Sequence, residues 1–283
     1  MNKLINNLLI MDYYKNNNNS FYEADSVLKN AGIWADYKNV SKEELENNRM
    51  VWKNNKLISL KEAKIEFDEF GKPITPVFTG KSGRGLLGRF GPNHACDPII
   101  TRFNFYNCKI EFIAVKRNDT NQWAIPGGMV DPGEKVSQTL KREFIEEASN
   151  NTDKKIIDKI FDKSNETILY SGPTYGDPRT TDCAWIETFV ANYHIDYNLW
   201  SKINLTNQPE ENSDVSWISC NNKDLYGDHY YFVQLAKKNV KKQLYKSFLK
   251  NVLCLYLGTI IVIFIYVLFE MFHEFNFQIH QHL

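Results

Sequence analysis

Three glutamates in the middle of the chain, Glu143, Glu146 and Glu147, have the spacing that brings side chains together on one face of a helix. Like charges at this spacing repel each other and destabilise an isolated helix. A hard divalent cation would offset the repulsion, because such cations take carboxylate oxygens as ligands. The nearby Arg142 and Glu134 also carry the charges for an internal ion pair.

A bare E-x-x-E-E run is more often a solvated helix face, but this run ends a longer pattern. The string fits G-x5-E-x7-R-E-U-x-E-E, where U is a bulky apolar residue, and its fixed positions are Gly128, Glu134, Arg142, Glu143, Phe144, Glu146 and Glu147. The chain therefore resembles the Nudix hydrolases, whose signature is this box. It departs from the signature at Ser149-Asn150, where the box usually ends in glycine and an apolar residue. That departure affects the end of the helix and leaves the carboxylates intact.

The segment from Trp123 to Ala148 predicts the elements that position these glutamates: a strand end, a glycine and proline loop, and a helix. Val136, Leu140 and Phe144 recur at i, i+4 and i+8, which predicts one apolar face directed at a sheet. The glutamates project from a different face, so packing and cation binding do not compete.

The rest of the chain predicts an α/β fold with a mixed sheet. Apolar or alternating runs predict strands, and amphipathic runs predict helices. The expected strands lie at 65–70, 105–116, 122–125, 168–170, 184–191 and 215–219, and the expected helices at 21–34 and 230–246, with a charged amphipathic segment at 152–164.

A glycine-rich segment, 79–97, carries the basic residues Lys81, Arg84 and Arg89, which raises the question of phosphate binding. The Walker pattern G-x-x-x-x-G-K-[ST] is absent from it. Glycine-rich turns with arginine are more often structural, and we expect a structural role here.

Composition narrows the possible partners and compartments. Lys plus Arg equals Asp plus Glu, so bulk charge gives no argument for a nucleic-acid partner. The five cysteines show no C-x-x-C spacing, which indicates free thiols in a reducing compartment. The first 20 residues, which include Asn17–Asn19, read as disordered, and their apolar run is too short and polar for a signal peptide.

The segment 252–269 has 18 residues without a charge and is apolar on all sides. At about 1.5 Å per residue it crosses most of a hydrocarbon core of about 30 Å, so we predict a transmembrane helix rather than a buried or interfacial one. Six lysines precede it between Lys237 and Lys250, and 270–283 contains no Lys or Arg. This bias places the catalytic domain on the cytosolic side as a tail-anchored protein, with lysines available to anionic lipid headgroups.

Several strings narrow the resemblance to the ADP-ribose pyrophosphatase branch of the Nudix hydrolases, which is related to the C-terminal domain of the ADP-ribose-gated melastatin-type channel. They are G-R-G-L-L-G-R from Gly83, G-P-N-H-A from Gly91, D-P-I-I-T-R from Asp97, G-G-M-V-D-P-G-E-K from Gly127, D-P-R from Asp177, and T-D-x-A-W-x-E-T from Thr181. The resemblance implies an N-terminal subdomain, 21–103, and a Nudix α/β/α sandwich, 104–247, ahead of the transmembrane helix and short tail.

The resemblance also implies hydrolysis of ADP-ribose to AMP and ribose 5-phosphate with Mg²⁺, or Mn²⁺. Glu143, Glu146, Glu147 and the Gly127 carbonyl would hold the metal, and Arg142 and Glu134 would orient them. Asp177, Arg179, Asp182 and His229 would bind the substrate, with His229 resting on the weaker match of the 225–229 loop. The general base stays open among Glu143, Asp182 and Glu187.

Two alternatives remain open at this point: a membrane-tethered ADP-ribose sensor with little turnover, and a Nudix hydrolase of another nucleoside diphosphate derivative. The intact Arg142-Glu143-Phe144 sequence favours an enzyme. The sequence specifies neither the membrane concerned nor the oligomeric state.

Overall fold

The computed structural model describes residues 23–75, 77–174, 176–210 and 212–281. The chain divides into two compact units, one ending at Ala236 and the other beginning at Lys237. The expected disorder of residues 1–20 lies outside the described residues.

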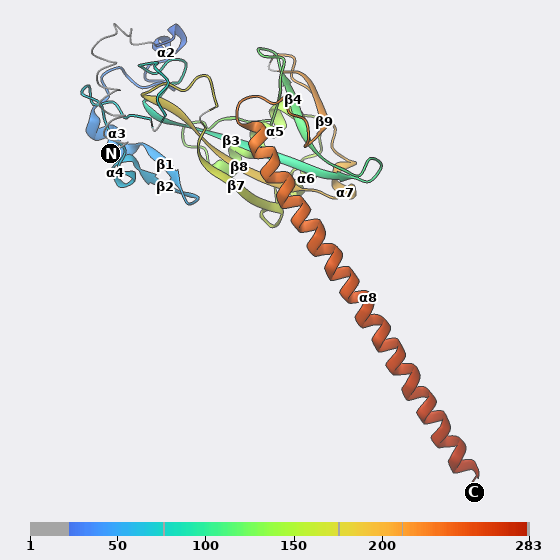
Figure 1. Ribbon diagram of the computed structural model, residues 1–283. Helices are drawn as coiled ribbons and strands as arrows, with labels where there is room; N and C mark the ends of the chain where they lie inside the picture. The colour runs from blue at the N-terminus through green and yellow to red at the C-terminus, as the bar shows by residue number, and fades with distance from the viewer. Residues whose placement is uncertain (1–22, 76, 175, 211, 282–283) are drawn as a thin grey trace. The chain divides into compact units, whose positions relative to one another are not determined.

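A seven-stranded mixed sheet forms the centre of the first unit (Figure 1). The strand order is β5-β4-β3-β8-β7, with β6 paired to β3 and β9 paired to β4. Strands β3 and β8 are parallel, and the other pairs are antiparallel. The strands are β3 (Gly91–Asn104), β4 (Lys109–Arg117), β5 (Trp123–Ala124), β6 (Gly128–Met129), β7 (Glu166–Thr174), β8 (Ala184–His194) and β9 (Asn212–Ser219). The predicted mixed sheet is confirmed.

Some strands begin or end at other residues than predicted, because turns or strand pairing set their limits. The strand expected from residue 105 begins at Lys109, because the preceding residues turn, with Cys108 at a φ of 54°. The strand expected at 168–170 extends to Glu166–Thr174, since it pairs along β8. The last residues of the glycine-rich segment, from Gly91, belong to β3.

Helix α5 (Val136–Ala148) packs on the sheet through the predicted apolar stripe. Leu140, Phe144 and Ala148 are fully buried in the main core, where Val136 packs as a partly buried side chain. Helix α6 (Lys154–Ile160) adds Ile157 and Ile160 to the same core. Two short elements, η1 (Lys163–Asn165) and α7 (Tyr197–Trp200), complete this part of the unit.

The N-terminal part contains short elements: α2 (Asp25–Lys29), α3 (Lys42–Asn48), β1 (Met50–Lys53), β2 (Lys56–Ser59) and α4 (Leu60–Ala63). Within the described residues from Glu23 onward, the helix expected at 21–34 is reduced to α2. The expected strand at Ile65–Phe70 is wrong, because the Asp68 carboxylate accepts hydrogen bonds from the backbone N–H groups of Phe70 and Lys72. This local turn competes successfully with the alternating pattern.

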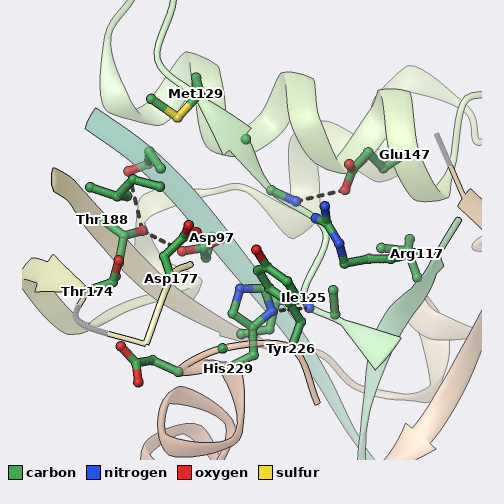
Figure 2. Close-up of a pocket in the computed structure, with 18 of the residues that line it drawn as sticks. Asp97, Arg117, Ile125, Met129, Glu147, Thr174, Asp177, Thr188, Tyr226 and His229 are labelled. Atoms are coloured by element: carbon green, nitrogen blue, oxygen red, sulfur yellow. Dashed lines mark hydrogen bonds between the residues drawn. The ribbon is translucent and has the colours of Figure 1, made fainter. Parts of the chain in front are cut away.

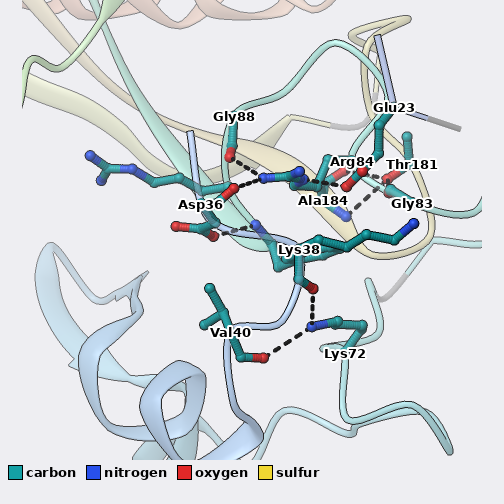
Figure 3. A network of polar contacts seen from close by, with 12 residues as sticks. Glu23, Asp36, Lys38, Val40, Lys72, Gly83, Arg84, Gly88, Thr181 and Ala184 are labelled. Carbon is teal, nitrogen blue, oxygen red and sulfur yellow. Dashed lines mark hydrogen bonds and ion pairs between the residues drawn. The ribbon is translucent and has the colours of Figure 1, made fainter. Parts of the chain in front are cut away.

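Arg84 explains why the glycine-rich segment is structural. Its side chain is fully buried, and its Nε donates to Glu23 Oε1 at 2.6 Å (Figure 3). The Nη1 group donates to the backbone carbonyls of Asp36 and Gly88. Gly83 and Gly85, on either side, have φ angles of 82° and 58°, which glycine adopts without strain. The arginine thus ties the N-terminal part together and is not available to a phosphate.

Helix α8 (His229–Gln281) is continuous, where the sequence indicated separate helices at 230–246 and 252–269. Its sequence contains no proline, and its only glycine is Gly258, so nothing interrupts the helical hydrogen bonds. The portion His229–Ile265 is long and apolar enough to cross a membrane, with a mean hydropathy of 2.2 in its most apolar window and none of that window buried. All five cysteines are free, as predicted.

Candidate active site

Arg142 organises the carboxylates of the box helix. Its guanidinium donates to both oxygens of Glu134, at 3.0 and 2.9 Å. It also pairs with Glu143 at 2.8 Å and with Glu146 at 2.9 Å. The hydrogen bonds with Arg142 hold the pKa of Glu134 below its ordinary value, and the pKa of Arg142 is correspondingly raised. The predicted ion pair with Glu134 is present, and this internal cation offsets much of the repulsion expected among the glutamates.

The loop glycines bring the backbone against the other glutamates. The Gly127 N–H donates to Glu147 Oε2 at 2.9 Å. A Cβ atom on Gly128 would lie 2.6 Å from Glu143 Oε1, so a larger residue here would require the Glu143 carboxylate to move. Glycine at this position therefore allows the loop after β5 to close onto the box helix.

These residues suit a hard divalent cation by donor type, because carboxylate and carbonyl oxygens are the ligands that Mg²⁺ prefers. Within the described parts of the chain, no three acidic, histidine or cysteine side chains already form a metal-binding cluster. Glu146 bonds to Arg142 and Glu147 to the Gly127 N–H. Cation binding would therefore require Glu146 to exchange one ionic partner for another.

A cavity of about 380 Å³ opens beside this loop (Figure 2). Five of the predicted site residues line it: Gly127, Glu147, Asp177, Arg179 and His229. The other five, Glu134, Arg142, Glu143, Glu146 and Asp182, are not among the lining residues. The structure thus brings one box carboxylate and three of the four predicted substrate-binding residues to a common space.

Asp177 and Arg179 form a bidentate pair in the cavity wall. Arg179 Nε and Nη2 donate to the two Asp177 oxygens at 2.9 and 2.7 Å. Burial opposes ionisation of Asp177, but its hydrogen bonds with Arg179 prevail and lower the pKa of its carboxyl group. The pair is thus charged on both sides and can offer donors and acceptors to a polar ligand.

His229, the first residue of α8, is held in one tautomer. The Ile125 N–H donates to His229 Nδ1 at 2.9 Å, so the neutral ring carries its proton on Nε2. Burial lowers the pKa of His229, which favours this neutral ring. The preceding residue, Asp228, accepts a hydrogen bond from the Gly176 N–H at 2.9 Å and thereby joins the Asp177 loop to the start of α8.

Two candidate bases, Asp182 and Glu187, accept hydrogen bonds from the N-terminal part of the first unit. Asp182 Oδ1 accepts from the Thr79 N–H at 2.5 Å and from its hydroxyl at 2.8 Å. Glu187 Oε2 accepts from the Trp52 N–H at 2.7 Å, and Oε1 from Trp185 Nε1 at 3.0 Å. Neither residue lines the cavity.

Several lining residues were not predicted, namely Asp97, Arg117, Thr188, Glu210 and Tyr226. Arg117 stacks on Tyr226, with its guanidinium carbon 4.3 Å from the ring centroid. Arg117 ends a strand that carried no motif, whereas Tyr226 lies in the 225–229 loop, of which only His229 was predicted. Asp97 had a detectable signal, because it opens the D-P-I-I-T-R string, yet nothing in that string shows which way its side chain points.

Comparison with known proteins identifies a sequence family that matches this part of the chain. Residues 102–235 match the sequence model of the NUDIX domain. The chain is 43% identical over 192 residues to the rat protein named ADP-ribose pyrophosphatase, mitochondrial, a match covering 59% of this chain and 54% of that protein. It is 47% identical over 171 residues to a Caenorhabditis elegans protein whose name places it among nudix hydrolases, covering 59% and 64%.

A Nematostella vectensis protein named transient receptor potential cation channel subfamily M member-like 2 is 41% identical over 189 residues, covering 59% of this chain and 12% of the channel. Among solved structures, the NUDIX domain of Shewanella oneidensis NrtR with ADP ribose aligns at 18% identity and a TM-score of 0.41, covering 53% and 88%. The chain spans less than two thirds of the length of these sequence relatives. The chain contains a Nudix domain, which occupies residues 102–235.

Proposed function

We propose that the chain is a membrane-tethered, divalent-cation-dependent hydrolase that cleaves ADP-ribose to AMP and ribose 5-phosphate. One observation carries the proposal: Glu147 of the box helix and the Asp177–Arg179 pair line the same cavity. A cation-binding carboxylate and groups able to hold a nucleotide would thus face one ligand. The rat relative, named as an ADP-ribose pyrophosphatase, supports this choice of substrate.

Some residues would bind the substrate, and others would position the carboxylates of the Nudix box. Arg179 and Arg117 line the cavity and can donate charge-assisted hydrogen bonds to ligand oxygens. Arg142 holds Glu134 and fixes the position of Glu143, while the Gly127 N–H fixes Glu147. His229 would offer its Nε2–H to an acceptor on the ligand.

Glu143, Glu146, Glu147 and the Gly127 carbonyl would hold the cation, for which we propose Mg²⁺, with Mn²⁺ as a substitute. When bound, such a cation neutralises phosphate charge and acidifies or orients the attacking water. Asp182 and Glu187 accept hydrogen bonds from the N-terminal part of the unit, whereas the Glu143 carboxylate lies against Gly128, which lines the cavity, so we prefer Glu143 as the general base.

Release of AMP from a panel of nucleoside diphosphate derivatives tests the substrate. We expect ADP-ribose to be preferred over sugar nucleotides and dinucleotides, and a chelator to stop the reaction until Mg²⁺ is restored. Glu146→Gln and Glu147→Gln should each reduce turnover by roughly a hundredfold or more while the fold persists. Turnover at the wild-type rate in both variants would contradict the proposal.

The sensor alternative predicts a different result from the same protein. Tight calorimetric binding of ADP-ribose without any release of AMP would assign the chain to it. Preference for another nucleoside diphosphate derivative would instead support the third candidate function.

Membrane tethering is proposed from the apolar part of α8, whose side chains from Val252 to Ile265 are exposed. The six lysines between Lys237 and Lys250 precede that part, which favours a cytosolic location for the Nudix domain and contact with anionic lipid. Helix α8 starts at the cavity residue His229.

A further inference from the structure

One wall of the cavity is a face of the sheet formed by two parallel strands. Alternate residues of a strand point to the same face, and Ala95 and Asp97 of β3 line the cavity together with Ile186 and Thr188 of β8. Thr188 lies opposite Ala95 in the register of the two strands, one alternate position away from Asp97. The Thr188 hydroxyl donates to Asp97 Oδ2. The wall is otherwise small or apolar, so a carboxylate there is conspicuous.

Asp97 has little structural reason to be a carboxylate. Its residue is only 7% exposed, and burial raises the pKa of its carboxyl group. Among the described residues no Lys or Arg forms an ion pair with it, and Oδ1 accepts no hydrogen bond. Burying a charged group with so few partners lowers stability. A ligand in the cavity would supply the missing donor.

The surroundings of Asp97 indicate which part of a nucleotide would lie there. In Figure 2, Asp97, Thr188 and Asp177 lie on one side of the cavity, and Arg117 and Glu147 on the other. The charge of Asp177 is balanced by Arg179, but Asp97 has no ion pair in the described residues, and such a carboxylate disfavours a phosphate beside it. His229 Nε2, by contrast, presents a proton and has no partner among the described residues. A hydroxyl group can both donate to the carboxylate and accept from the imidazole.

We propose that Asp97 binds a ribose hydroxyl of the nucleotide through Oδ1 and so selects ribose over the corresponding deoxyribose. The inference deepens the proposed function and rests on it. A Cβ atom on Gly127 would lie 2.5 Å from Asp97 Oδ1, so the carboxylate adjoins the loop that leads into the box. A sugar held at Asp97 would therefore lie next to the residues proposed to act on the diphosphate.

The test compares ADP-ribose with two analogues, each lacking the 2-hydroxyl of one ribose, using the full chain in detergent micelles. The wild-type protein should prefer ADP-ribose over one analogue by roughly 10- to 100-fold in kcat/KM, as for a hydrogen bond to a charged group. Asp97→Asn should lose most of that preference, chiefly through a higher KM for ADP-ribose. Asp224→Asn, at an exposed aspartate outside the cavity lining, should retain it.

Three outcomes would overturn the inference. Asp97→Asn could retain the wild-type preference against both analogues. It could instead lose discrimination between ADP-ribose and its hypoxanthine analogue, which would assign Asp97 to the base. It could also leave sugar preference intact and change only the Mg²⁺ concentration required for half-maximal activity, which would assign Asp97 to the cation.

Thr188→Val covers the case in which Asp97→Asn fails to fold, as judged by its thermal unfolding. This variant removes the donor to Oδ2, together with a long 3.4 Å contact to the Ala95 carbonyl, so we expect the same loss of sugar preference to a smaller extent, and an unchanged preference contradicts the inference. If the wild-type chain releases no AMP at all, the proposed function fails. Calorimetric titration with the same three ligands then still decides whether Asp97 recognises the hydroxyl.

Discussion

Glu187 offers a quantitative test of how the N-terminal hairpin is held on the sheet. The residue is 2% exposed, and its two oxygens accept from the Trp52 N–H and from Trp185 Nε1. Burial raises the pKa of its carboxyl group from 4.5 to about 7, although both hydrogen bonds oppose the rise. Because one pKa unit corresponds to about 1.4 kcal/mol, ionising this buried group costs about 3 kcal/mol of folding free energy.

The sign of the effect follows from the two protonation states. Below the unfolded-state pKa the carboxyl group is protonated in both states, and stability is unaffected by it. Between pH 4.5 and about 7 the unfolded chain ionises Glu187 while the folded protein keeps it protonated, so stability falls over this range and is constant above it. The free energy of unfolding should therefore be lower at about pH 8 than at about pH 5, by up to about 3 kcal/mol from Glu187 alone.

Denaturant unfolding across this pH range, followed by tryptophan fluorescence, measures the stability of the first unit, because all six tryptophans precede Lys237. Glu187→Gln cannot ionise, so its stability should lack this decline and converge on or exceed that of the wild type at high pH. Glu62→Gln, an exposed glutamate in α4, should keep the wild-type profile. Identical pH profiles for wild type and Glu187→Gln would refute the assignment.

Three further predictions concern the core, the box and the anchor. Phe144→Ala should lower the free energy of unfolding by about 3–5 kcal/mol in the same denaturation assay, because the ring is fully buried between α5 and the sheet. Arg142→Lys should reduce AMP release by about tenfold or more with little change in thermal stability, since an ammonium group cannot reproduce the paired hydrogen bonds to Glu134; full activity would contradict this role. Deletion of residues 252–283 should move the protein from the membrane to the soluble fraction on centrifugation, and continued membrane association would exclude that segment as the anchor.

The Nudix box could be predicted from the sequence because its charged residues lie close together in the chain. Glu134, Arg142 and the three glutamates lie within 14 residues on one loop and helix, and helical periodicity alone brings them together. The same periodicity identified Leu140 and Phe144 as the buried stripe. Strand alternation was less reliable, since Ile65–Phe70 has the pattern of a strand but forms a turn around Asp68.

The sequence by itself determined the mixed α/β fold, the Nudix box, the Arg142–Glu134 pair and the apolar character of α8, because each depends on residues close together in the chain. Only the tertiary structure decided which distant residues share the cavity. In the parallel register of β3 and β8, Asp97 and Thr188 face the cavity. Glu187 and Asp182 instead accept hydrogen bonds from the N-terminal part of the unit and do not line the cavity. The physical reason is that side-chain direction follows from strand pairing and burial across more than 80 residues of intervening chain, which no local pattern encodes.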